Sequence, residues 1–131
     1  MTSSPSDHAH DISFGTGVAA SLRRPSVELR RKIPDVYEGF RHLHDAAFAD
    51  GALDRRTKEL IALAIAVADR CDGCIASHAR GCVEHGASED EVVEMLGVCI
   101  LMMGGPGTVY GPRAHAAYLE FAEQKAQRAA G

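Results

Sequence analysis

Nine consecutive apolar residues near the middle of the chain constrain the fold more than any other feature of the sequence. The run is Leu60-Ile61-Ala62-Leu63-Ala64-Ile65-Ala66-Val67-Ala68. Asp54 is a suitable N-cap for a helix over about residues 55–69 that contains the run. A helix that is apolar on every face belongs in the interior of a protein. At about a dozen residues it is too short to span a bilayer, so we expect it to be the central helix of a globular domain.

Helical patterns continue on both sides of this run. The pattern begins near Ser26, and Pro34 suits the first turn of the next helix. Ser88 and Glu91 form a capping box ahead of another helix. No strand pattern or hairpin turn is present, and only 5% of the residues are aromatic. The spacing of apolar residues predicts helices over about residues 35–49, 72–85, 89–103 and 108–128. The fold class is therefore an all-α single compact domain of five or six helices over residues 26–131.

The first 25 residues have a different composition. They mix Ser, Pro, Gly, Asp and His without a sustained period. Such a segment cannot bury enough apolar surface to order itself, so residues 1–25 are predicted to be a disordered or extended arm. His8 and His10 in this arm do not form a preorganised metal site.

The charge and the opening residues limit the partners and the compartment. The formal net charge of −4 argues against nucleic acid or an anionic membrane surface as the main partner. Residues 1–14 lack a basic segment followed by an apolar one, and no run reaches the length of a membrane span. A cytoplasmic location is the expectation. In that reducing compartment a Cys-x-x-Cys motif is more often catalytic or metal-binding than structural.

The chemistry is concentrated in such a motif, Cys71-x-x-Cys74, followed four residues later by His78. In a helix that starts at about Asp72, Cys74 shares a face with His78, and Cys71 lies at the positive N-terminal end. A helix N-terminus and a nearby imidazolium both stabilise thiolate, the reactive form of cysteine. The motif therefore predicts a redox-active dithiol.

Glu59 adds a carboxylate to this group. It lies 71 − 59 = 12 residues before Cys71, on the neighbouring helix and at the edge of the interior. If the chain reverses between the two helices, antiparallel packing brings Glu59 level with the second half of the motif. His78, oriented by Glu59, would then take the proton from Cys74. One thiolate would attack a peroxide to give a sulfenic acid, and the other thiol would condense with it to a disulfide.

A metal-binding module is a competing interpretation. Cys71, Cys74 and His78 offer three ligands, and Cys82 or His85 offers a fourth. All of these residues lie along one helix, whereas a zinc site usually takes its second pair of ligands from a separate element. We therefore expect no metal. Cys82 and Cys99 are most simply small buried apolar residues.

Glu59, eleven intervening residues, and then Cys71-x-x-Cys74-x-x-x-His78 resemble the signature of the alkylhydroperoxidase D branch of the carboxymuconolactone decarboxylase superfamily. The resemblance covers about residues 35–122. It implies an all-helical fold and a cofactor-free hydroperoxidase, with Cys74 as attacking thiol, Cys71 as resolving thiol, and Glu59 and His78 as proton relay. It also implies a small hydroperoxide substrate, an external thiol or disulfide reductant, and a homo-oligomer, commonly a trimer or hexamer.

The sequence departs from this pattern at Gly73, where the best-known peroxidase members carry a further histidine. Asp72 beside it would oppose thiolate formation by its charge, and helix capping is its expected role. The order of attack stays open, because thioredoxin-like chemistry would use Cys71 first. Two other functions remain as alternatives: an acid/base enzyme of the lactone decarboxylase type, which does not need the cysteine pair, and a non-catalytic oligomeric scaffold.

Overall fold

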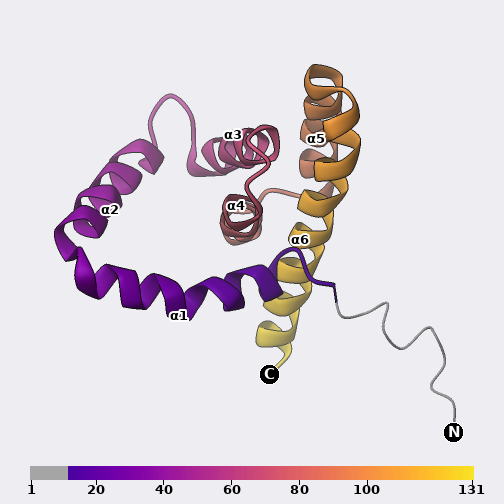
Figure 1. Cartoon of the computed structure of the whole chain (residues 1–131). Coiled ribbons are helices and arrows are strands. Elements are labelled where there is room, and N and C mark those ends of the chain that lie inside the picture. The colour runs from indigo at the N-terminus through magenta and orange to yellow at the C-terminus, as the bar shows by residue number, and fades with distance from the viewer. Residues whose placement is uncertain (1–11) are drawn as a thin grey trace, which may run out of the picture.

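Six helices account for most of residues 12–131, the part of the chain that the computed structural model describes (Figure 1). They are α1 (Thr16–Lys32), α2 (Pro34–Phe48), α3 (Arg55–Ala68), α4 (Asp72–Glu84), α5 (Glu89–Met103) and α6 (Gly105–Ala130). No strand occurs within this range, which confirms the all-α prediction. None of the helices in residues 12–131 is both long and apolar enough to cross a membrane.

The core lies where α3, α4, α5 and α6 meet. Helix α4 packs on α3 and α6, and α5 packs on α6 and α3. The fully or nearly fully buried apolar side chains of this core include Leu63, Val67, Ile75, Ala79, Cys82, Val92, Ala114, Ala117 and Phe121.

The expectation that α3 is buried on every side is wrong for the single chain. Leu63, Ala66 and Val67 face the core, but Ile61 and Ile65 are exposed. The reason is that α4, α5 and α6 pack on one side of α3, and Ile61 and Ile65 on its other side are left uncovered by residues 12–131.

The ends of α4 and α5 follow from local sequence. Gly86 adopts a φ of +83° after α4, and the N–H of Ala87 donates to the carbonyl of Cys82 at 2.9 Å. These are the features of a glycine-terminated helix end. The capping box of Ser88 and Glu91 is present at the start of α5. Helix α6 begins three residues earlier than predicted, because Gly104, with a φ of +71°, is the single residue between α5 and α6.

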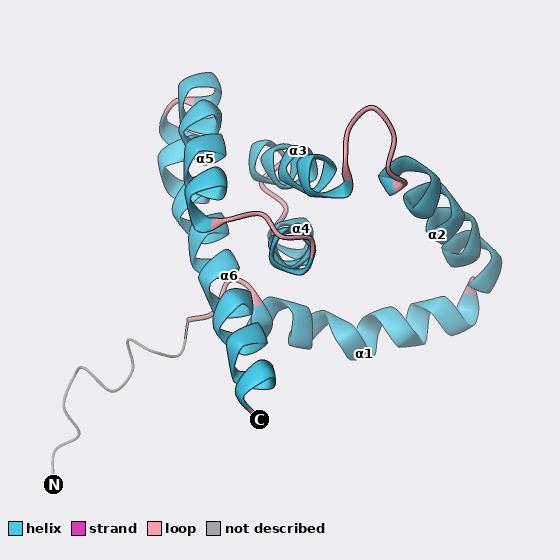
Figure 2. Cartoon of the chain, turned by 180° about the vertical axis from the view of Figure 1, so that it is seen from behind, coloured by secondary structure: helices cyan, strands magenta, loops and turns pink. Residues whose placement is uncertain are grey.

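Helices α1 and α2 form an arch that leaves the core and returns at the start of α3 (Figure 2). The prediction of a helix over residues 35–49 is confirmed by α2. Its apolar face is not part of the core, however, since Val36, Phe40 and Leu43 are each about two-thirds exposed. The helical period identified the apolar face of α2, but not its partner.

The predicted arm needs a correction. Helix α1 begins at Thr16, so residues 16–25 are helical rather than disordered or extended, and Pro25 lies inside the helix. Residues 1–11, which include His8 and His10, lie outside the described residues. Helix α1 is mostly polar and has no fully buried side chain, so its contacts with α4 and α6 help to hold it in place.

Glu120 of α6 makes a group of hydrogen bonds at the start of α1. Its Oε2 accepts hydrogen bonds from the N–H groups of Phe14, at 3.1 Å, and Gly15, at 3.3 Å. Its Oε1 accepts from the N–H and hydroxyl of Thr16, at 3.2 and 2.9 Å, and from the hydroxyl of Ser13. Burial acts to raise the pKa of Glu120, but these hydrogen bonds outweigh it, and the pKa falls below its usual value. A carboxylate distant in sequence thus caps α1.

We expect Glu120→Ala to lower the free energy of unfolding by about 1–3 kcal/mol, because several N–H groups at the start of α1 lose a charged acceptor. The exposed Glu123, three residues later on α6, provides the matched control Glu123→Ala. The pKa of Glu120 is lowered by folding, so its contribution is complete above the unfolded-state pKa and is lost as the pH falls through the folded-state pKa. Urea titrations at pH 7 and in mild acid measure this: a difference between the wild type and Glu120→Ala that did not shrink in acid would contradict it.

Candidate active site around the Cys-x-x-Cys motif

A short turn between α3 and α4 creates the site. The N–H of Cys71 donates to the carbonyl of Ala66 at 3.1 Å, and Arg70 takes a φ of +54°. The two helices therefore run antiparallel, and residues near the start of α3 lie beside the second half of α4.

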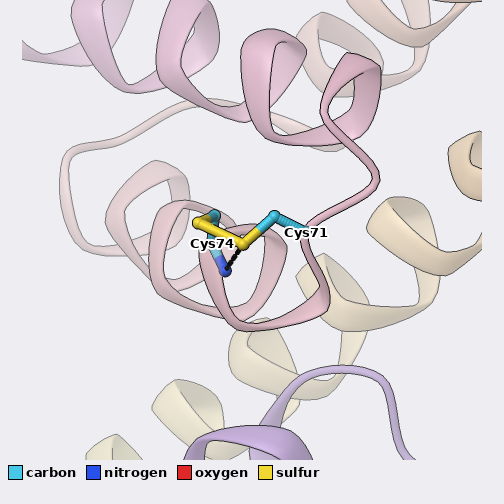
Figure 3. Close-up of a disulfide and its surroundings, with 2 residues drawn as sticks. All are labelled: Cys71 and Cys74. Carbon is cyan, nitrogen blue, oxygen red and sulfur yellow. Dashed lines mark hydrogen bonds between the residues drawn. A yellow bond between two sulfur atoms is a disulfide. The ribbon is translucent and has the colours of Figure 1, made fainter.

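The two cysteines of the motif lie at the first turn of α4. Their sulfur atoms are joined in a disulfide, with 5.2 Å between the Cα atoms (Figure 3). Cys71 is the N-cap residue, and its sulfur accepts a hydrogen bond from the N–H of Cys74 at 3.3 Å. Cys74 is exposed and Cys71 is half-buried. In the reduced protein, the helix N-terminus would stabilise negative charge on the Cys71 sulfur.

Glu59 and His78 are in direct contact. Oε2 of Glu59 lies 2.9 Å from Nδ1 of His78, one turn beyond Cys74 on α4. Oε1 of Glu59 accepts from Nε of Arg55 at 2.9 Å, and Nη2 of Arg55 is also 2.9 Å away. Only 2% of Glu59 is exposed. The structure therefore brings together the carboxylate and the imidazole that the sequence placed on neighbouring helices.

The buried carboxylate is held ionised by its partners. Burial acts to raise the pKa of Glu59, but the hydrogen bonds and charges of His78 and Arg55 outweigh it, and the pKa falls below its usual value. With Oε2 facing Nδ1, the Nε2 atom of the His78 ring is left to exchange protons elsewhere. The arrangement has the parts of a general base oriented by a carboxylate.

The sequence interpretation missed three residues of this site. Arg55 pairs with Glu59 four positions later in α3, a spacing that the sequence does show. Phe48 stacks on His78, with 5.6 Å between ring centroids, and only the tertiary structure reveals it. Gly81, one turn beyond His78, lies directly against the Glu59 carboxylate.

Gly81 leaves the space that Glu59 occupies. A Cβ atom at this position would lie 2.7 Å from Oε1 of Glu59 and closer still to Oε2. We expect Gly81→Ala to displace the carboxylate from His78 and to lower the free energy of unfolding by about 1–3 kcal/mol. Gly97, on α5, has open space at the same position and supplies the control Gly97→Ala. Chemical denaturation measures both variants, and equal stabilities would show that the site accommodates the methyl group.

The departure at Gly73 has a structural counterpart. A Cβ atom there would lie 2.9 Å from Cδ1 of Leu22 on α1. Part of the space above the first turn of α4 is thus taken by Leu22, which belongs to the part of α1 that the sequence interpretation placed in the disordered or extended arm.

Arg113 of α6 offsets the charge of Asp72 beside the cysteines. Its Nη1 lies 3.2 Å from both carboxylate oxygens of Asp72. The guanidinium also lies over the rings of Phe14 and Tyr110, at 5.2 and 4.7 Å from their centroids. These contacts hold one positive charge at the N-terminal end of α4.

We expect Arg113→Gln to leave the Asp72 charge unopposed and to reduce the thiolate fraction of the reduced cysteine pair. Alkylation of the reduced protein by iodoacetamide at neutral pH should slow by roughly two- to tenfold, and added salt should narrow the difference. Arg128→Gln is the matched control, because Arg128 joins α6 to Glu84 at the far end of α4. Faster or unchanged alkylation of Arg113→Gln would rule out this role for Arg113.

The alternative metal set is not assembled. Cys82 is fully buried, and burial, together with the charges of Glu59 and Glu91, raises its pKa to about 12. His85 is exposed at the C-cap of α4. Within residues 12–131, no group of three or more His, Cys, Asp or Glu residues is placed to hold a metal ion. Cys82 and Cys99 are both buried, as expected of small apolar residues.

Comparison with known proteins places this site in a family. A carboxymuconolactone decarboxylase family protein from Legionella pneumophila, crystallised in its apo form, has a similar fold, with a TM-score of 0.79 and 39% sequence identity. The similarity covers 82% of this chain and 96% of that protein.

Several curated relatives carry the name uncharacterised protein. One from Cupriavidus necator is 38% identical over 62% of this chain and 72% of its own length. A protein of the cox locus of Paracoccus denitrificans is 36% identical over 66% of this chain and 78% of its own length. One from Methanocaldococcus jannaschii is 31% identical over 74% of this chain and 86% of its own length.

The sequence model of the carboxymuconolactone decarboxylase family matches residues 34–123. This range runs from the start of α2 into the second half of α6 and includes Glu59, the cysteine pair and His78. The match spans more than half of the chain, and the similar crystal structure shares its helical fold. The chain therefore belongs to the carboxymuconolactone decarboxylase family.

Proposed function

We propose that this protein is a thiol-dependent peroxidase of the alkylhydroperoxidase D type, which reduces a small hydroperoxide with the Cys71 and Cys74 thiols. The observation that carries the proposal is the contact between Glu59 and His78, one helical turn from a cysteine pair whose sulfur atoms join. A carboxylate, an imidazole and two neighbouring thiols are the groups that such a reaction needs.

The first step oxidises Cys74. His78 accepts the proton of the Cys74 thiol, and the thiolate attacks the terminal oxygen of the hydroperoxide. A sulfur–oxygen bond forms while the oxygen–oxygen bond breaks. The alkoxide leaves with the electron pair and takes the proton from His78, so the products are an alcohol and a sulfenic acid on Cys74.

The second step forms the disulfide. The Cys71 sulfur attacks the Cys74 sulfenic acid, the sulfur–oxygen bond breaks, and the hydroxyl leaves as water with the proton of the Cys71 thiol. An external dithiol then reduces the disulfide by exchange and becomes oxidised itself. The exposure of Cys74 suits attack by such a reductant.

Glu59 supports the relay without touching the substrate. Its carboxylate holds one ring nitrogen of His78 and stabilises the imidazolium that forms when the thiol loses its proton. Arg55 limits the negative charge that the buried carboxylate presents to the thiolates. The missing histidine at Gly73 leaves His78 as the base of this mechanism.

A homo-oligomer is part of the proposal, and the apolar surface of the single chain supports it. Large apolar side chains remain uncovered on α2, α3 and α5, and Leu101 and Met102 are each about 80% exposed. Monomeric proteins rarely leave contiguous apolar surface of this kind in water.

An acid/base reaction that does not use the thiols is the second candidate, favoured by the family match. It would need Glu59 and His78 but neither cysteine. Cysteine variants therefore separate the two functions.

We expect Cys74→Ser to abolish the consumption of an organic hydroperoxide in the presence of dithiothreitol, and His78→Ala to slow it by roughly 10²- to 10⁴-fold. Cys99→Ala, at a buried cysteine outside the site, is the control. Mass spectrometry after one equivalent of hydroperoxide should show the loss of two hydrogen atoms in a peptide that links Cys71 with Cys74. Unchanged Cys71 and Cys74 thiols in the wild-type protein after the hydroperoxide is added, or peroxide consumption that survives in Cys74→Ser, would exclude the thiol peroxidase and leave the acid/base enzyme as the candidate.

A further inference from the structure

The C-terminal end of α2 contacts the relay, although the rest of α2 stands away from the core (Figure 1). The ring of Phe48 stacks on His78, with centroids 5.6 Å apart and planes inclined by 24°. The guanidinium of Arg55 lies 4.6 Å from the centroid of the same ring. Phe48 thus contacts both residues that bind the Glu59 carboxylate.

Phe48 is held in this position from α3, the helix that also carries Glu59 and Arg55. The ammonium group of Lys58 donates to the carbonyls of Ala47, at 2.9 Å, and Ala49 at the end of α2. The N–H of Arg55 donates to the side chain of Asp50 at 2.7 Å. These bonds tie the last turn of α2 to the first turn of α3, so the ring and the carboxylate share one support.

The stacking restricts how the imidazole can move. The side chain of His78 is 21% exposed, and Phe48 covers one of its faces. Among the described residues, Glu59 on α3 contacts the ring directly and Arg55 contacts Glu59. The cysteine pair lies one turn earlier on α4, and His44 of α2 packs on Phe48 with 4.6 Å between ring centroids. Without the phenyl ring, water would reach the bond between His78 and Glu59, and the imidazole would gain rotational freedom.

We propose that Phe48 is a positioning residue of this site, which holds the His78 imidazole on the Glu59 carboxylate and excludes water from their hydrogen bond. The inference rests on the proposed peroxidase function for its effect on rate, but not for its effect on the hydrogen bond. An orienting group of this kind preserves the geometry that proton transfer requires. Through Phe48, helix α2 contributes a residue to the candidate site.

The test compares Phe48→Ala with Phe48→Tyr, which keeps the ring, and Phe48→Leu, which keeps most of the bulk without the ring. Phe40→Ala is the matched control, because Phe40 makes the same change on the exposed side of α2. The first readout is the rate at which the His78 Nδ1–H proton exchanges with water. This rate is measured by NMR on the low-field resonance of that proton. We expect faster exchange in Phe48→Ala and Phe48→Leu, and protection as in the wild type in Phe48→Tyr and Phe40→Ala.

The second readout is peroxidase kinetics. We expect kcat to fall roughly 10- to 100-fold in Phe48→Ala with KM little changed, and to recover in Phe48→Tyr. Should Phe48→Ala fail to fold by circular dichroism, Phe48→Leu serves in its place.

Unchanged proton exchange and kcat in both Phe48→Ala and Phe48→Leu would overturn the assignment. Equal losses in Phe40→Ala would overturn it as well, since the effect would then belong to the docking of α2 as a whole. If the wild-type protein reduces no hydroperoxide, the proposed function fails, while the proton exchange still decides whether Phe48 holds His78.

Discussion

The buried carboxylate of Glu59 is the group on which the rest of this structure depends. Removing a charge from water costs several kcal/mol unless partners satisfy it. Arg55 from the same helix and His78 from α4 provide those partners, each at 2.9 Å. Gly81 leaves the space in which the carboxylate fits. The packing of α3 on α4 is therefore fixed by polar contacts as well as by apolar ones, and the same contacts orient the imidazole of the site.

Charged groups also stabilise the N-terminal end of α4. Cys71 caps the helix with its sulfur, and Asp72 in the first turn is balanced by Arg113 from α6. A helix N-terminus favours negative charge, so a thiolate and a carboxylate compete for the same positive field. Arg113 reduces this competition, because its guanidinium offsets the charge of the Asp72 carboxylate. Charged side chains from α3 and α6 thus reach α4 on both sides of Cys74 in the sequence, at His78 and at Asp72.

Membership in the carboxymuconolactone decarboxylase family accounts for the helical fold. Within that fold, the chemistry follows from the residues present. The cysteine pair distinguishes a thiol-based reaction from one that uses only Glu59 and His78. Helices α1 and α2 add contacts of their own, since Leu22 lies over Gly73 and Phe48 over His78.

Local sequence by itself determined the helices from α2 onward, their caps at Asp54 and Ser88, and the spacing that places Glu59 and the motif on adjacent helices. These features depend on residues within a few positions of one another, so a sequence pattern is sufficient. Only the tertiary structure decided that residues 16–25 are helical, that α3 is buried on one side alone, and that Phe48 and Arg113 reach the site. Each of these outcomes depends on contacts between residues far apart in the sequence, such as those of Glu120 of α6 with the start of α1. A local sequence pattern does not indicate which distant side chain makes such a contact.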